Sequence, residues 1–151
     1  MNWILKTFNE LTIDELHDIV QLRIKVFVVE QNCPYPELDG KDRNAYHFFG
    51  HDEEGRIVAY TRIFGPGDYY AQPAIGRVVV DSEHRGDGTG YALMRGTIEN
   101  MKKLFGDSEI KIGAQKYLVE FYENLGFTNT EEEYVEDGIP HVYMIRKSGL
   151  L

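Results

Sequence analysis

The sequence is short of cysteine, of long hydrophobic runs and of basic residues. Its 151 residues include one cysteine, Cys33, which excludes an internal disulfide framework and favours a reducing environment. No apolar run approaches the roughly 20 residues that cross a bilayer, and the residues after Met1 show neither the basic leader nor the apolar region of a secretion signal. We therefore expect a cytoplasmic protein with no membrane partner.

Basic residues are outnumbered by acidic ones. The chain carries 16 Lys and Arg residues against 25 Asp and Glu residues, which gives a net charge of −9. Because nucleic acids are bound by clustered basic faces, this balance argues against a nucleic-acid partner. An acidic surface is compatible with a cationic substrate, and it also keeps many proteins in solution. The length and ordinary composition predict one globular domain over residues 1–151.

A metal site is not expected either. The five histidines form no ligand motif, because His47 and His51 are four residues apart but belong to an expected strand and its turn. Cys33 has no adjacent histidine to activate it and is interpreted as a small structural residue.

Hydrophobic periodicity and turn residues predict alternating strands and helices. Thr12 and Glu15 form a capping-box pattern ahead of apolar residues at helical spacing, and Gly106 and Gly126 are expected to end two later helices. We predict strands over 3–8, 45–51, 56–64, 74–80, 109–114, 127–135 and 139–147, with helices after the first, fourth and fifth of them. This order implies an α/β domain with a mixed sheet that has antiparallel pairs at both ends.

Three glycines lie between the strand over 74–80 and the helix that follows it. A P-loop is excluded because Tyr91 and Ala92, rather than lysine and a hydroxyl residue, follow Gly90. A dinucleotide fingerprint is excluded because position 91 is tyrosine and no acidic residue ends the next strand. The remaining pattern, Arg85-x-x-Gly88-x-Gly90, predicts a cradle of main-chain N–H groups for a pyrophosphate at a helix N-terminus. The alternative is a glycine-rich turn without a ligand.

The segment "VVVDSEHRGDGTG" resembles the pyrophosphate motif of the GNAT superfamily of acyl-CoA-dependent N-acyltransferases, and "QKYLVEFYENLGF" resembles its second signature. The segments "LRIKVFVVEQNCPYPELDG" and "EDGIPHVYM" are similar to the ElaA-like members. The resemblance spans nearly the whole chain. It implies a mixed, mostly antiparallel sheet flanked by helices and splayed at the cofactor site. It also implies an N-acetyltransferase that uses acetyl-CoA and a small-molecule or peptide amine, and it leaves a homodimer open.

The resemblance also assigns the contacts of coenzyme A. Main-chain groups of the valines should pair with pantetheine, and the N–H groups of residues 86–91 should hold the pyrophosphate. Gln115 stands where many members have asparagine. The expected cofactor-binding residues are Val78, Val79, Val80, Arg85, Gly86, Asp87, Gly88, Thr89, Gly90, Tyr91 and Gln115.

Catalysis requires a proton for the departing thiolate and a base for the amine. The resemblance assigns the proton donor to Tyr122, whose alternative role is packing beside Phe121 and Leu125. The strand before the glycines lacks an acid, so Glu30 is the candidate base because it follows an apolar turn and could be half-buried with a raised pKa. The alternatives are a structural role for Glu30 and a water chain to solvent.

Three residues are candidates for the acceptor site. Arg77 could orient a carboxylate or an acyl oxygen, or could lie at the surface. Asp39 and the nearby Asp42 follow the first helix, and His141 could line the pocket or be a hydrogen-bonded strand histidine. Two other functions remain open, a non-catalytic acyl-CoA-binding module and an enzyme like acyl-homoserine-lactone synthases, although those enzymes have longer chains.

Overall fold

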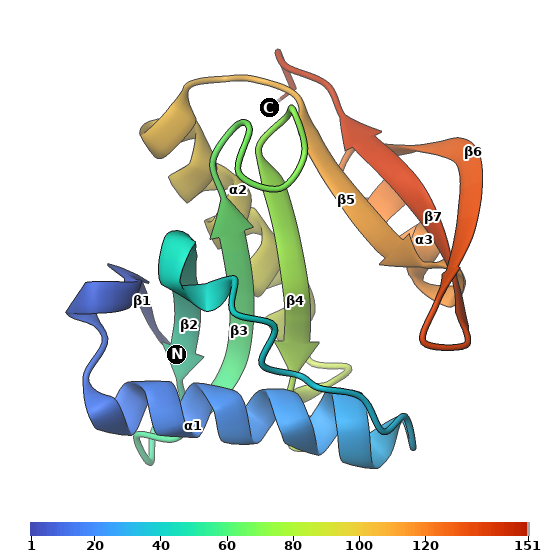
Figure 1. Ribbon diagram of the computed structural model, residues 1–151. Helices are drawn as coiled ribbons and strands as arrows, with labels where there is room; N and C mark the ends of the chain where they lie inside the picture. Colours follow the sequence, from blue (N-terminus) through green and yellow to red (C-terminus); the bar gives the residue numbers. More distant parts are fainter. Residues whose placement is uncertain (151) are drawn as a thin grey trace.

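The predicted strands pair into one seven-stranded sheet of order β1-β2-β3-β4-β5-β7-β6 (Figure 1). Every neighbouring pair is antiparallel except β4 and β5, which are parallel. The strands are β1 (Asn2–Thr7), β2 (Tyr46–His51), β3 (Ile57–Phe64), β4 (Ala74–Val80), β5 (Ile110–Gln115), β6 (Phe127–Glu136) and β7 (Ile139–Arg146). The computed structural model describes residues 1–150, so the last residue of the expected domain lies outside them.

The helices begin and end where local signals place them. Thr12 and Glu15 exchange both capping-box hydrogen bonds at the start of α1, and Gly106 caps the end of α2. The helix predicted after β5 is shorter than expected, because a 3₁₀ turn precedes its five α-helical residues. The helices are α1 (Ile13–Ile24), its π-helical extension η2 (Lys25–Glu30), α2 (Thr89–Phe105), α3 (Val119–Glu123) and the 3₁₀ turns η1 (Phe8–Glu10), η3 (Asp42–Asn44), η4 (Ser82–His84) and η5 (Lys116–Leu118).

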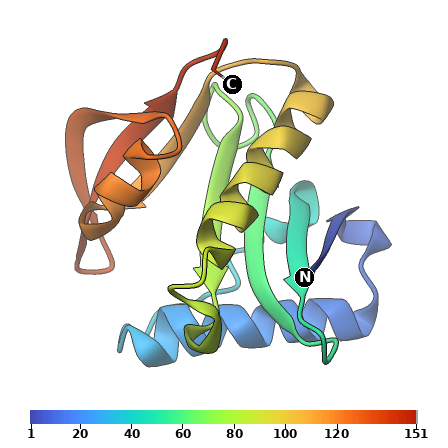
Figure 2. The ribbon, with the colours of Figure 1, turned by 180° about the vertical axis from the view of Figure 1, so that it is seen from behind.

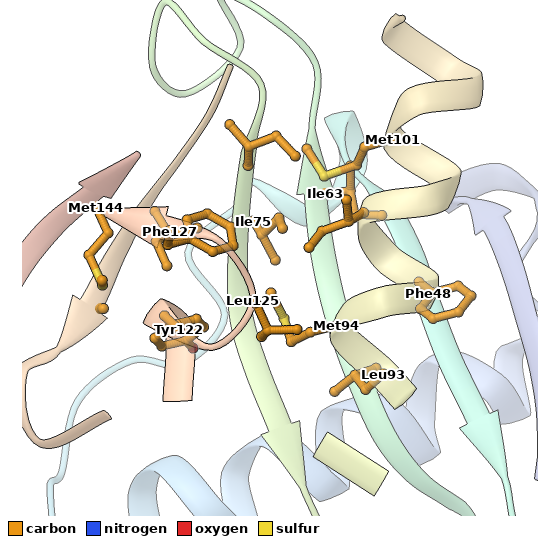
Figure 3. Close-up of a cluster of buried hydrophobic side chains, with 14 of the residues drawn as sticks. Phe48, Ile63, Ile75, Leu93, Met94, Met101, Tyr122, Leu125, Phe127 and Met144 are labelled. Atoms are coloured by element: carbon orange, nitrogen blue, oxygen red, sulfur yellow. The ribbon is translucent and has the colours of Figure 1, made fainter. Parts of the chain in front are cut away.

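The helices cover both faces of the sheet, α1 on one and α2 with α3 on the other (Figure 2). The α1 layer buries Ile19 and Leu22 against Tyr60 and Phe49. The other layer is larger and is shown in Figure 3, where Leu93, Met94 and Met101 of α2 share a core with strand residues and with α3. Burial of these apolar faces is the main stabilising contribution to the fold.

The sheet is open between β4 and β5. Their pairing is confined to one end, where Ala74 is registered with Lys111 and the Lys111 N–H donates to the Pro73 carbonyl at 3.0 Å. From that point the two strands diverge, as Figure 1 shows. The predicted splay is therefore confirmed, and it leaves the lower part of β4 without a partner on this side. Such an edge carries unpaired N–H and C=O groups that an extended ligand can use.

Candidate functional site

The gap between β4 and β5 opens into a cavity of about 870 Å³. Its walls come from both strands, from the start of α2, from α3, and from the loop that links η2 to η3. The predicted site residues converge on it from distant parts of the chain. Those that line it are Glu30, Asp39, Arg77, Val78, Val79, Val80, Arg85, Gly86, Gly88, Gly90, Tyr91, Gln115, Tyr122 and His141. Two predicted cofactor residues, Asp87 and Thr89, do not.

The glycine turn presents bare main chain to this cavity. Gly86 and Gly88 have φ values of 81° and 89°, in the left-handed region that favours glycine. The first intrahelical hydrogen bond of α2 runs from Ala92 to Gly88, so the N–H groups of Gly90 and Tyr91 lie ahead of any acceptor in the helix. These amides and the positive end of the α2 dipole are suited to an anion such as a pyrophosphate.

Asp87 and Thr89 serve the turn itself. The Asp87 carboxylate accepts hydrogen bonds from the Thr89 N–H at 3.0 Å and from the Thr89 hydroxyl at 2.6 Å. These bonds lower the pKa of Asp87, so the carboxylate is ionised and caps the first turn of α2. The resemblance assigned both residues to the cofactor through their main-chain N–H groups, and the Thr89 N–H is already bonded to Asp87. Their contact with the cofactor stays a prediction. They fix the conformation of the turn that carries the bare amides.

Two of the three valines of β4 direct their main-chain groups into the gap between β4 and β5. The Asp81 N–H donates to the Val58 carbonyl in β3 at 2.8 Å. Because peptide groups along a strand point alternately to its two sides, Val79 pairs with β3, and Val78 and Val80 direct their groups into the gap. The expectation for Val79 is thus corrected, since its main chain is already used within the sheet.

Glu30 does not have the environment that was expected for a base. Its side chain is 39% exposed, and its carboxylate accepts two hydrogen bonds from Arg85, at 2.6 and 3.2 Å. Arg85 also donates from Nε to the Val80 carbonyl at 3.0 Å. The prediction of a half-buried Glu30 is wrong, because the carboxylate lies at the mouth of the cavity beside a cation. Glu30 and Arg85 join η2 to the glycine turn.

Gln115 faces the loop that crosses the opening. It exchanges two amide hydrogen bonds with Gln31, each 3.4 Å long. The Cys33 thiol, on the same loop, lies 3.3 Å from the Asp137 carbonyl in the turn between β6 and β7. The loop therefore connects the two halves of the splayed sheet across the cavity.

Tyr122 combines a packed ring with a free hydroxyl. The residue is 5% exposed, and its ring makes edge contacts with Phe121 and Phe127 in the core drawn in Figure 3. Within residues 1–150 its hydroxyl has no hydrogen-bond partner, yet the oxygen is not enclosed, because the side chain lines the cavity. Burial raises the pKa of this phenol above its usual value. The hydroxyl is therefore a protonated group at the edge of the cavity.

Six charged side chains form a closed network beside the cavity. Arg23 donates to Glu37 at 2.7 Å and to Asp42 at 2.9 Å. Arg62 donates to Asp42 at 3.0 Å and, through two nitrogens, to Asp39 at 2.9 Å. Arg77 donates to Glu37 at 2.8 Å and lies 3.6 Å from Asp39. Each arginine contacts two carboxylates and each carboxylate two arginines. We call this the arginine–carboxylate ring, and its members in order are Arg23, Glu37, Arg77, Asp39, Arg62 and Asp42.

Two carboxylates of the arginine–carboxylate ring, Asp39 and Asp42, are unsuited to act as the base. Burial acts to raise the pKa of Asp39 and Asp42, but hydrogen bonds and charges from Arg62 and Arg23 outweigh it and hold both pKa values below their usual range. Ionised carboxylates with low pKa values are weak bases for an ammonium group. Asp39 and Arg77, predicted as acceptor-binding residues, keep only part of their surface free, with side chains 24% and 21% exposed.

Arg77 reaches the ring through an irregular backbone. The register between β3 and β4 shifts between Tyr60 and Arg62, and Arg77 has a φ of 50°. This combination is a β-bulge, which redirects a side chain out of the regular alternation. A left-handed conformation costs a non-glycine residue on the order of 1 kcal/mol, and the bonds to the ring hold it in place.

Sequence reasoning missed three ring members. Arg23, Glu37 and Arg62 are 0%, 4% and 1% exposed. The available signal was a lone arginine inside an apolar run, "QLRIKVF" for Arg23 and "VAYTRIF" for Arg62. A charge in such a position is either redirected to solvent or paired inside the protein.

His141 is placed on β7 next to the cavity. It is 7% exposed, and its ring stacks on Tyr134 of β6 with centroids 5.1 Å apart. Its Nδ1 lies 2.7 Å from the Ile139 carbonyl, and its Nε2 lies 3.8 Å from Glu136. Both interpretations of this residue hold, because it is a hydrogen-bonded strand histidine and it also lines the cavity.

Residues 1–150 contain neither a cluster of metal ligands nor a membrane-spanning helix. No group of three or more His, Cys, Asp or Glu side chains is placed to hold a metal ion. No helix there is long and apolar enough to cross a bilayer.

Known proteins are similar to this chain in sequence and in fold. Residues 15–148 match the family model described as an acetyltransferase (GNAT) domain. The chain is 41% identical over 141 residues to protein ElaA of Escherichia coli, with 92% of each chain covered. The crystal structure of that protein superposes with a TM-score of 0.88, covering 97% of this chain and all of the other. An acyl-CoA N-acyltransferase from Pseudomonas aeruginosa superposes with a TM-score of 0.90 at 38% identity, covering 97% and 99% of the two chains.

Proposed function

Because the chain belongs to the GNAT family of acyl-CoA N-acyltransferases, we propose that it transfers an acetyl group from acetyl-CoA to a primary amine. The observation that carries the proposal is the meeting, in one cavity, of the bare glycine turn, the unpaired edge of β4 and the free hydroxyl of Tyr122. The amine is carried by a small molecule or a peptide.

The chain can hold acetyl-CoA along the gap. The N–H groups of Gly90 and Tyr91 receive the pyrophosphate, and the main chain of Val78 and Val80 pairs with the amide groups of pantetheine. This arrangement places the thioester in the gap between β4 and β5, near α3. The thioester supplies the activated acyl group, and the chain provides alignment and proton transfer.

Tyr122 supplies the proton for the leaving group. When the amine nitrogen bonds to the thioester carbon, the C–S bond breaks and its electron pair stays on sulfur. A phenol is protonated at neutral pH, so it can donate to the thiolate as the C–S bond breaks and recover a proton from solvent. The free hydroxyl favours catalysis over a module that only binds acyl-CoA.

The test is release of free CoA thiol from acetyl-CoA in the presence of amines. Spermidine, lysine, glucosamine and a short peptide with a free N-terminus sample four classes of acceptor. We expect amine-dependent thiol release with one class and an acetylated product of matching mass. Tight binding of CoA without release for any amine would instead support a binding module. Absence of both would contradict the proposal.

A further inference from the structure

We propose that His141 is the general base of the acyl transfer, taking the proton of the acceptor amine at Nε2 and passing it to Glu136 and solvent. The inference rests on the proposed function, since it assigns a residue to that reaction. It fills a gap in the site, because Glu30 is paired with Arg85, and arginines hold the pKa values of Asp39 and Asp42 below their usual range.

The hydrogen bond to Ile139 fixes the tautomer of the ring. A carbonyl oxygen only accepts, so the nitrogen 2.7 Å from it, Nδ1, must carry a proton. In the neutral imidazole this leaves the lone pair on Nε2, the form required of a base. The stacking of the ring on Tyr134, with planes 26° apart, restricts its rotation.

The Nε2 atom of His141 is not enclosed by protein atoms. Within residues 1–150, Nε2 has no hydrogen-bond partner, yet it is not one of the fully enclosed side-chain atoms that lack a partner. It therefore keeps accessible surface, on a residue that lines the cavity. Along the sheet, His141 is registered opposite Gln115, the last residue of β5. The chain turns there into η5 and α3, which carries Tyr122. The base is thus one strand away from the gap in which the thioester is expected.

The surroundings provide a route for the proton. Glu136 lies 3.8 Å from Nε2 and is 52% exposed, so it can accept the proton and release it to water. The other titratable group in contact with the imidazole is Tyr134, stacked on it from β6. Gln115, on the β5 side, is uncharged. The Glu136 carboxylate favours the imidazolium that forms during the reaction.

The proton balance of the reaction is closed. The amine nitrogen forms a bond to the thioester carbon and loses one proton to Nε2 of His141. The C–S bond breaks, and the sulfur takes one proton from the Tyr122 hydroxyl. His141 then loses its proton through Glu136, and Tyr122 regains one from water, so the net products are the amide and free CoA thiol.

The experiment compares His141→Gln with His17→Gln, using acetyl-CoA and the amine that gives the highest turnover in the panel. His17 is a matched control because it is exposed on α1 and pairs with Asp18. We expect His141→Gln to lower kcat by about 100-fold or more, with the KM for acetyl-CoA within about twofold.

A second measurement does not depend on turnover. Long-range ¹H–¹⁵N NMR of the wild-type histidines reports which ring nitrogen bears the proton, and the structure predicts Nδ1–H for His141 near neutral pH. A proton on Nε2, or an unchanged kcat in His141→Gln, overturns the inference while the proposed function stands. Wild-type protein that acetylates none of the amines overturns the proposed function and the inference with it. Melting curves of both variants exclude loss of folded protein as the cause.

Discussion

The two ends of the cavity treat polar groups in opposite ways. At one end, the arginine–carboxylate ring pairs three cations with three anions, so that each charge has two partners. At the other end, within residues 1–150, the amides of Gly90 and Tyr91 have no such partner, and the side of β4 that faces the gap has no neighbouring strand, although the Val80 carbonyl accepts a hydrogen bond from Arg85. A buried charge without a partner is strongly destabilising, so a paired network indicates a structural role. Unpaired groups that border open space indicate a surface for a ligand.

The same contrast separates two buried tyrosines. Burial raises the pKa of both Tyr60 and Tyr122. Tyr60 lies close to the arginine–carboxylate ring, and its hydroxyl is hydrogen-bonded to Nδ1 of His47 at 2.6 Å. The Tyr122 side chain instead lines the cavity. One phenol completes the protein interior, and the other is available to a substrate.

Removing one charge from the ring should have the largest effect. Arg23→Met keeps the aliphatic stem and leaves Glu37 and Asp42 each with one cation fewer in a fully buried position. We expect a loss of about 3–5 kcal/mol in the free energy of unfolding, measured by urea denaturation. Arg56→Met, at a side chain 57% exposed, is the control and should change it by less than about 1 kcal/mol. Equal, small losses in both variants would show that the ring has no structural role.

Tyr122→Phe should affect the rate more than the stability. The change removes one hydroxyl without a protein partner and keeps the ring, so kcat should fall by about 100-fold and the melting temperature should barely move. Tyr60→Phe should do the reverse, because it breaks the bond to His47 and leaves the cavity unchanged. Full activity in Tyr122→Phe would remove the hydroxyl from the mechanism. Because burial raises its pKa, Tyr122 should cause no alkaline decline in kcat below about pH 10.

A methyl group at the glycine turn should weaken CoA binding. Gly88 and Gly106 flank α2, both have positive φ, and an added Cβ has nothing within 4 Å at either position. Alanine is therefore strained at both ends, but Gly88 alone of the two lines the cavity. We expect Gly88→Ala to raise the Kd for CoA by about tenfold or more, the cost of one or two hydrogen bonds to a charged group. Gly106→Ala should lower stability and leave the Kd unchanged, whereas equal affinities in calorimetry would argue against the cradle.

Glu30→Gln should have the smallest effect. An exposed ion pair contributes about 0.2–1 kcal/mol. Breaking the pair between Glu30 and Arg85 should therefore change kcat by less than about fivefold. A 100-fold loss in steady-state kinetics, with unchanged KM for acetyl-CoA, would return Glu30 to the role of base.

The sequence predicted the end of the cavity that carries the glycine turn better than the end that carries the arginine–carboxylate ring. A main chain without side chains can be recognised in the sequence, because Gly86, Gly88 and Gly90 lie close together between a strand and a helix. The order of elements followed from periodicity, and β4 was predicted with its observed bounds. The splay between β4 and β5 and the role of Tyr122 were predicted from the family resemblance, because neither can be recognised from the hydrophobic pattern of the sequence.

The ring was not predictable because it depends on tertiary contacts. Leu16, Ile19, Val20, Ile24 and Phe27 share the expected apolar spacing, yet Ile24 is 38% exposed and Arg23 is fully buried. Glu37 and Asp39 follow in a proline-containing loop whose course no local rule specifies. Glu30 was misjudged for a similar reason, since its exposure is decided by a π-helical turn and by Arg85, 55 residues away.

The most direct test of the contrast is amide ¹H–¹⁵N NMR of the wild-type protein during titration with CoA. If the open groups form the binding surface, the largest shifts should fall on Gly86, Gly88, Gly90, Tyr91, Val78 and Val80, at one CoA per chain. The amides of Arg23, Glu37, Asp42 and Arg62 should move little, since their side chains are already paired. Shifts centred on the ring with an undisturbed glycine turn, or no saturable shifts at all, would contradict the account.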